Sequence, residues 1–210
     1  MRKGRGLLAA AVMLAAPWVA AAQQQPNQEE ITRLANQIRK KIVTLSNYGV
    51  FDNITFGIAP CTAGYKVTLK GQASRPTLKD SAERVVKEIE LVESVTNEIE
   101  VLPTSRHDED IRLAAYAKIY YHPTLSRYNP NRGTPIYGVQ RRAFMGISTD
   151  PPLGPHPIHI IVKNGNITLE GVIDTEMDKS ILNVQANSVP GAFSVTNNVV
   201  VLQPAKEKKK

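Results

Sequence analysis

The sequence predicts an α+β protein of two tandem α-β-β-α-β modules, each a three-stranded mixed sheet covered by two helices. The main observation behind this prediction is an internal repeat. Val67–Gly71 (VTLKG) matches Ile167–Gly171 (ITLEG), and Ser94–Asn97 (SVTN) recurs as Ser194–Asn197, both at the same offset along the 210-residue chain. The second observation is that apolar residues follow helical and strand periods in the same order in each copy. Two matches in one register indicate a duplication.

The first module is predicted to span residues 27–103. A helix over 27–46 is expected because its apolar residues recur at three- and four-residue spacings, and Asn47–Gly49 ends it. Alternating apolar residues then predict a hairpin of strands around 54–58 and 65–70, with Gly71 stopping the second strand. A helix from Thr77 and a strand over Val95–Leu102 complete the module, and the helix crossover makes this strand parallel to the one before it.

The second module is predicted to span residues 107–203, with a first helix over Asp110–Tyr121. The preceding acidic run at 107–110 is read as a helix start favoured by the helix dipole. Asn164-Gly165 between alternating apolar residues is a strong signal for a tight hairpin. Thr175 or Asp174 is expected to cap the second helix. The last strand, Val199–Leu202, is apolar on both faces, so more burial is expected there than in the first module, at a domain or oligomer contact.

An insertion at residues 122–157 distinguishes the second module from the first. It is rich in proline, arginine and aromatic residues, and residues 136–147 within it are compatible with a short extra strand or a turn of helix. Long loops inside compact domains are uncommon and often functional. Arginines bind phosphate, and neighbouring apolar side chains enter lipid interfaces. The candidate lipid- or partner-binding residues are therefore Arg127, Arg132, Arg141, Arg142 and Phe144, and the alternative is a solvated loop.

The two ends of the chain carry most of its charge. Residues 1–22 combine a basic start, an apolar run of about 14 residues and Ala20-Ala21-Ala22, which is typical of a secretory signal peptide and too short to span a bilayer. Residues 204–210 form a basic tail. Of the net charge of +7, the signal and the tail account for all but about +1. A basic surface for nucleic acid is therefore not expected, and no transmembrane segment is expected after cleavage.

No constellation of catalytic or metal-ligating residues is visible. Cys61 is the only cysteine, so an intramolecular disulfide is excluded, and it is read as a packed residue or an exposed thiol. The four histidines lack a ligand pattern and are expected at the surface, with His159 pointing outward from its strand. Gly71 and Gly171 are expected to serve backbone geometry. The sequence thus predicts no enzyme, no cofactor and no metal.

The repeated motifs resemble the BON (bacterial OsmY and nodulation) domain family. The residues that carry the resemblance are Val67–Gly71 with Ser94–Asn97, and Asn164–Gly171 with Gly191–Asn197. The chain departs from the family pattern in its long insertion, in a longer first hairpin and in having Leu91 where the family has glycine. The resemblance implies residence in the periplasm or envelope, no catalysis, and contact with anionic phospholipid or envelope proteins in envelope maintenance or osmotic stress. The alternative it implies is a periplasmic chaperone-like assembly factor for envelope proteins.

Overall fold

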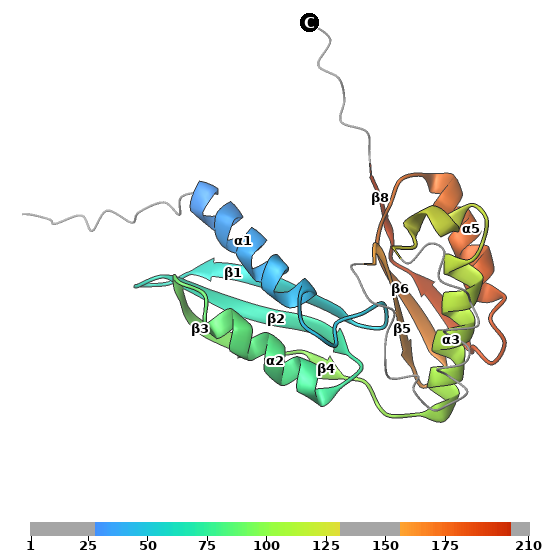
Figure 1. Ribbon diagram of the computed structural model, residues 1–210, viewed down its shortest axis with the longest axis horizontal. Helices are drawn as coiled ribbons and strands as arrows, with labels where there is room; N and C mark the ends of the chain where they lie inside the picture. The colour runs from blue at the N-terminus through green and yellow to red at the C-terminus, as the bar shows by residue number, and fades with distance from the viewer. Residues whose placement is uncertain (1–27, 131–155, 203–210) are drawn as a thin grey trace, which may run out of the picture.

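The first module folds around one sheet in a computed structural model of the chain, which describes residues 28–130 and 156–202. Helix α1 (Gln28–Val43) leads to strand β1 (Asn53–Pro60). Strand β2 (Tyr65–Ala73), helix α2 (Pro76–Lys87), strand β3 (Val92–Asn97) and strand β4 (Glu100–Val101) follow. Strand β2 lies in the centre, antiparallel to β1 and parallel to β3 and β4. The predicted order α-β-β-α-β is confirmed, and we call this unit domain 1 (Figure 1).

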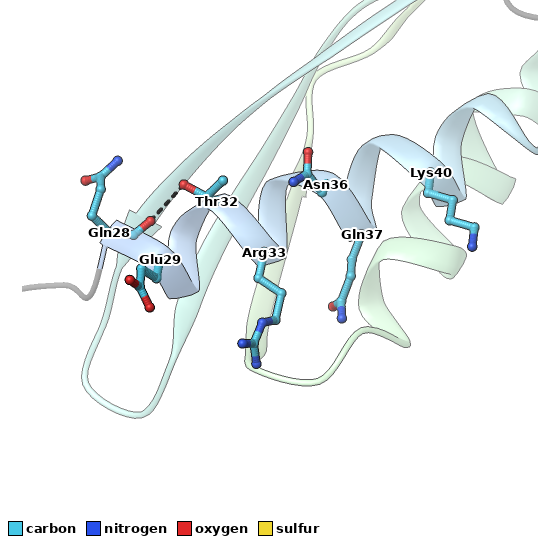
Figure 2. Close-up of a pocket in the computed structure, with 7 residues that line it drawn as sticks. All are labelled: Gln28, Glu29, Thr32, Arg33, Asn36, Gln37 and Lys40. Atoms are coloured by element: carbon cyan, nitrogen blue, oxygen red, sulfur yellow. Dashed lines mark hydrogen bonds between the residues drawn. The ribbon is translucent and has the colours of Figure 1, made fainter.

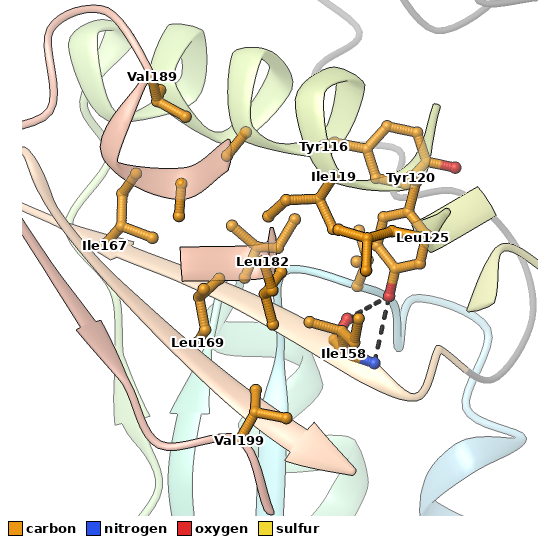
Figure 3. Close-up of a cluster of buried hydrophobic side chains, with 14 of the residues drawn as sticks. Tyr116, Ile119, Tyr120, Leu125, Ile158, Ile167, Leu169, Leu182, Val189 and Val199 are labelled. Carbon is orange, nitrogen blue, oxygen red and sulfur yellow. Dashed lines mark hydrogen bonds between the residues drawn. The ribbon is translucent and has the colours of Figure 1, made fainter. Parts of the chain in front are cut away.

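The second module, domain 2, repeats the same topology. Helix α3 (Arg106–Tyr120) is followed by the 3-10 helix η1 (Leu125–Tyr128), strands β5 (Ile158–Lys163) and β6 (Asn166–Ile173), helix α5 (Glu176–Asn187), and strands β7 (Ser194–Asn197) and β8 (Val200–Val201). Strand β6 is central, antiparallel to β5 and parallel to β7 and β8. Buried apolar side chains of α3, α5, β5 and β6 form its core (Figure 3).

Three expectations about strands need correction. The third strand of each module is broken into two segments, because Asn97 or Asn197 accepts a hydrogen bond from the backbone N–H two residues ahead. Neither β2 nor β6 stops at its glycine. Gly71 and Gly171 lie inside these strands with φ of 108° and 130°, conformations that favour glycine.

The end of the last strand is more exposed than expected. Val200 and Leu202 keep 61% and 56% of their surface exposed, whereas Val199 is buried. The apolar residues on both faces of this strand therefore do not mark a buried contact within the described part of the chain.

Helix starts follow the capping rules. Ser105 caps α3 and accepts a hydrogen bond from the N–H of Asp108, so the helix begins four residues before the predicted start. Thr175 caps α5, which decides between the two predicted candidates. Asp108 does more than favour the helix dipole. Its buried carboxylate accepts hydrogen bonds from the N–H groups of Asn164 and Gly165, which fixes the β5–β6 turn to α3.

The two domains are joined by more than the linker. The loop between α1 and β1 places Val50 and Phe51 in the hydrophobic core of domain 2. The Phe51 ring meets Tyr116 edge-on at 6.4 Å, and Val50 O accepts a hydrogen bond from Ile160 N at 2.8 Å. Helix α3 is thus covered on two sides, by its own sheet and by this loop, which explains why its apolar residues do not form a single stripe.

Candidate functional site

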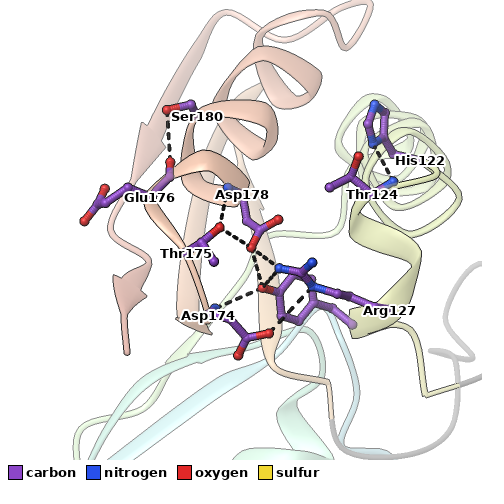
Figure 4. A network of polar contacts seen from close by, with 9 residues as sticks. His122, Thr124, Arg127, Asp174, Thr175, Glu176, Asp178 and Ser180 are labelled. Carbon is purple, nitrogen blue, oxygen red and sulfur yellow. Dashed lines mark hydrogen bonds and ion pairs between the residues drawn. The ribbon is translucent and has the colours of Figure 1, made fainter. Parts of the chain in front are cut away.

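Arg127, the predicted site residue that the structure describes, belongs to a network inside domain 2. Its guanidinium pairs with Asp178 and lies 3.6 Å from the Asp174 carboxylate (Figure 4). Tyr128 donates a hydrogen bond from its hydroxyl to Asp178 and accepts one from Asp174 N, both at 2.9 Å. Burial would raise the pKa of Asp178, but hydrogen bonds from Thr175 and Tyr128 and the charge of Arg127 hold that pKa below its usual value.

This network anchors the start of the insertion to the N-terminus of α5. Because two carboxylates already neutralise Arg127, it is not a free phosphate-binding cation. The other four predicted residues, Arg132, Arg141, Arg142 and Phe144, lie outside the described residues, as does the extra element expected within 136–147. The predicted site as a whole therefore stays a prediction, and the described residues offer a different surface on α5.

The outer face of α5 carries an exposed apolar row. Met177, Ile181 and Val184 are spaced four and three residues apart, so they share one face of the helix. Met177 and Val184 are 72% and 63% exposed, while Ile181 is half-buried against the core. We call these three residues the α5 stripe.

Domain 1 shows that the fold does not require this row. Its helix α2 has the same burial pattern, with Leu78, Ala82 and Val86 buried where α5 buries Asp178, Leu182 and Ala186. At the positions of the α5 stripe, however, α2 carries Thr77, Ser81 and Arg84. The same scaffold thus presents a polar face in one copy and a largely exposed apolar face in the other, so the fold of the module does not require Met177 and Val184 to be apolar.

Phe193 repeats this contrast in the loop before β7. Its ring is 76% exposed, packs over the backbone of Gly165 and lies 5.7 Å from the His107 ring, whereas the matching residue of domain 1 is Glu93. The sequence signal for both surfaces was the repeat itself. Comparing the two copies position by position at exposed sites would have found them.

A second feature is a cleft of about 680 Å³ between the domains. Domain 1 contributes Arg39, Val43, Tyr48 and β1, and domain 2 contributes Pro157, His159 and the end of β6. Burial raises the pKa of Tyr48 to about 12 and lowers the pKa of His159, whose ring lies 5.9 Å from that of Tyr48.

Three of the four histidines are more buried than predicted: His122 and His159 are half-buried, and His156 is buried. His159 points away from the core of domain 2, as its place on the strand predicts, but the α1–β1 loop covers it, so it is half-buried. His156 is buried with its ring edge-on to Tyr120 at 5.3 Å. The contact between the domains covers His159, whereas His156 packs against the Tyr116 and Tyr120 rings of its own domain, and no strand pattern reveals either contact.

Two charged groups are buried beside the same contact. The Asp52 carboxylate accepts hydrogen bonds from Gly49 N at 3.0 Å and Ser74 N at 2.6 Å, and burial raises its pKa. Arg112 donates to Val162 O at 2.9 Å, and burial lowers its pKa. Both side chains satisfy backbone groups, so their role is structural.

The outer face of α1 also carries a shallow polar hollow, which is lined entirely by side chains of one helix, and Figure 2 shows them pointing outward. It has no converging groups that would define a binding site.

Cys61 is exposed and donates a hydrogen bond to Glu93, which raises the pKa of the thiol. Within residues 28–130 and 156–202, no group of three or more His, Cys, Asp or Glu side chains is placed to hold a metal ion. None of the described helices is long and apolar enough to cross a membrane.

The repeated topology agrees with a comparison against protein families. The family model described as BON domain matches residues 62–103 and again residues 146–203, one match in each module. The chain contains two BON domains. Each match begins after the first helix of its module, and the first match begins between β1 and β2.

Comparisons with individual proteins add little to the BON assignment. No curated protein sequence matches the chain. Among solved structures, the chain is similar to CdsD, a structural protein of the type III secretion system of Chlamydia trachomatis, at 14% identity and a TM-score of 0.25, covering 83% of this chain and 94% of that one. The C-terminal domain of CdsD gives the same identity and TM-score over 80% and 96% of the two chains. A likeness at this TM-score supports no conclusion about this protein.

Proposed function

We propose that this tandem BON protein is a non-catalytic binding protein of the bacterial envelope that contacts phospholipid surfaces through domain 2. The observation that carries the proposal is the pair of BON domains, a domain typical of periplasmic proteins and associated with phospholipid. The signal peptide proposed for residues 1–22 agrees with this location. N-terminal sequencing of the exported protein tests that part, and the expected first residue is Gln23.

The α5 stripe is the surface we assign to lipid contact. Exposed Met and Val side chains on one helix face enter the boundary between headgroups and acyl chains, and the energy gained scales with the apolar area that leaves water. The lysines of the tail, residues 206–210, would add attraction to anionic lipid, roughly 1 kcal/mol for each charge near the surface. Because that attraction is screened by salt, binding should combine a salt-sensitive and a salt-resistant part.

Co-sedimentation with vesicles tests the proposal. The chain from Gln23 onward should pellet with vesicles containing anionic phospholipid, and the pelleted fraction should fall when Met177→Thr and Val184→Arg give α5 the residues of domain 1. A matched control, Asn183→Thr with Asn187→Arg, places the same residue types on another exposed face of α5. Equal pelleting of both double variants and the parent would reject the α5 stripe, and no pelleting at low salt would reject lipid contact altogether.

The second candidate function is a chaperone-like assembly factor for envelope proteins. The same exposed apolar residues on α5 and Phe193 would serve a client polypeptide as well as a membrane. Suppression of aggregation of an unfolded outer-membrane protein at up to equimolar ratio, lost in the Met177→Thr/Val184→Arg variant, would favour this function over the first.

A further inference from the structure

The two BON domains treat the outer edges of their sheets differently. In domain 2, the pairing register of β5 with β6 leaves the N–H and C=O groups of Ile158, Ile160 and Val162 pointing away from β6. The Tyr120 hydroxyl lies between Ile158 N and Ile158 O (Figure 3), Val50 O accepts from Ile160 N, and Arg112 donates to Val162 O. This edge is therefore closed by side chains of α3 and by the main chain of the α1–β1 loop.

Among residues 28–130 and 156–202, nothing closes the corresponding edge of domain 1. Ile54 pairs with Gly71 as Ile158 pairs with Gly171, so Phe56 and Ile58 correspond to Ile160 and Val162. Cys61 N donates a hydrogen bond to Gly64 O, so Cys61 faces the neighbouring strand. In an antiparallel pair, the backbone groups of successive residues point alternately toward and away from the partner strand. Counting back from Cys61, the backbone groups of Phe56 and Ile58 point away from β2. Within the described part of the chain, no hydrogen bond reaches these groups from the outer side. We call the outward backbone groups of Phe56 and Ile58 the β1 edge.

The cause lies on the first helix of each module. The buried residues Leu34, Ile38 and Ile42 of α1 match Ile111, Ala115 and Ile119 of α3. In that alignment, Ala35 stands where α3 has Arg112, and Val43 stands where it has Tyr120. Neither alanine nor valine can donate a hydrogen bond from its side chain, so α1 cannot cap the edge as α3 does.

Strand β1 also lacks the features that usually protect an edge. Its eight residues carry no charge, and its proline is the last of them. Phe56 and Ile58 are half-buried, and the other face presents Thr55, Gly57 and Ala59, which are small. A Cβ added at Gly57 would meet no described atom within 4 Å, so this face of the strand is open at Gly57.

The cleft between the domains borders one end of this edge, at Phe56. Residues 53–56 line one wall, and Pro157 and Val172 of domain 2 stand on the other. A cleft of about 680 Å³ is of the size that takes small ligands or short segments. A second folded copy would have to bring an entire sheet into this space, whereas a single extended chain needs only its own width. The contact of Val50 with Ile160 shows that the fold accepts main chain at the equivalent position.

We propose that the β1 edge binds an extended, apolar segment of another polypeptide, which adds as a strand beside Phe56 and Ile58. Main-chain hydrogen bonds supply the affinity in such strand addition, and pockets for alternate side chains supply the selectivity. Here the alternate side chains would lie over Val43 and Val172, both exposed in the cleft. The edge and the α5 stripe are separate surfaces, so this inference does not depend on lipid contact.

The test uses the chain from Gln23 onward and a fluorescein-labelled neutral heptapeptide of alternating threonine and valine, followed by fluorescence anisotropy. Two further peptides carry N-methyl groups on the valine amides or on the threonine amides. In a bound strand, either the valine amides or the threonine amides face β1, and the other amides face solvent. The peptide methylated on the amides that face β1 should therefore bind about tenfold or more weakly, and the other methylated peptide should bind like the parent. Equal affinity for all three peptides, or no binding of the parent peptide up to about 1 mM, would overturn the proposal.

A pair of protein variants provides an independent check. Ala35→Arg places the capping arginine of domain 2 beside Ile58, and Asn36→Arg places the same charge on the exposed face of α1. The first should weaken peptide binding about tenfold and the second should leave it unchanged. Met177→Thr/Val184→Arg should leave peptide binding intact even if it abolishes vesicle binding. A dimer in sedimentation velocity that Ala35→Arg dissociates would assign the edge to a second copy and refute the proposal.

Discussion

The glycines inside the two central strands offer a strong test of the duplicated architecture. An ideal Cβ at Gly171 would lie 2.0 Å from Pro157 O, and one at Gly71 would lie 2.0 Å from Asn53 O. Both clashes are with backbone at the start of the neighbouring edge strand, Asn53 in β1 and Pro157 immediately before β5, so a flexible side chain cannot relieve them. Gly171→Ala and Gly71→Ala should therefore each destabilise their own domain.

The size of the effect follows from two contributions. A non-glycine residue at these positive φ values costs about 1 to 3 kcal/mol. Moving Pro157 O away from the new methyl group also weakens its hydrogen bond from Val172 N, worth about 1 kcal/mol. We expect each substitution to lower the free energy of unfolding by about 2 to 4 kcal/mol.

Urea unfolding followed by far-UV circular dichroism measures this loss, since the only tryptophan, Trp18, lies in the proposed signal peptide. Gly57→Ala is the matched control, because Gly57 lies in a strand, has no positive φ and has open space at the Cβ position. It should change stability by less than about 0.5 kcal/mol. If Gly171→Ala proves as stable as Gly57→Ala, the assigned register of β5 against β6 is wrong.

Three other predictions each concern a single residue. Leu91 has φ of 74° where domain 2 has Gly191, so Leu91→Gly should raise the free energy of unfolding by up to about 1 kcal/mol in urea, and a loss would contradict the strain assigned to it. Asp108→Asn should lower the free energy of unfolding by about 2 kcal/mol, measured by thermal unfolding. The carboxylate accepts hydrogen bonds from Asn164 N and Gly165 N, and in asparagine one of its two oxygens is replaced by an NH₂ donor. Unchanged stability would refute that role of Asp108. Burial lowers the pKa of His159, so the unfolded chain takes up its proton first as pH falls below about 6.5, and stability should drop until pH passes the folded pKa; His159→Gln should remove this part of the pH dependence.

Much of the fold could be predicted from the sequence because its signals are local. The Asn164-Gly165 hairpin forms where expected, with positive φ at both residues, and Thr175 caps α5. The break in the third strands was missed because an Asn97 side chain, and not an apolar pattern, turns the chain there. The sequence predicts a strand end at Gly71, but a glycine at positive φ can also lie within a strand.

The contact between the domains could not be predicted, because it depends on residues distant in the sequence. Val50 and Phe51 read as apolar residues in a turn, and only the folded chain places them on α3. The same contact covers His159, which strand periodicity alone places at the surface. Its charge makes Arg127 a candidate in the sequence, whereas its pairing with Asp178 depends on the folded start of α5.

The central claim, that domain 2 meets phospholipid through α5, is tested most directly by a two-dimensional NMR titration of the chain from Gln23 onward with anionic lipid micelles. We expect amide shifts centred on Met177, Ile181 and Val184, with no matching shifts at Thr77, Ser81 and Arg84 of domain 1. Shifts confined to residues 128–146 would assign the contact to the insertion instead. Shifts confined to residues 206–210, or an unchanged spectrum, would contradict a lipid-binding surface on domain 2.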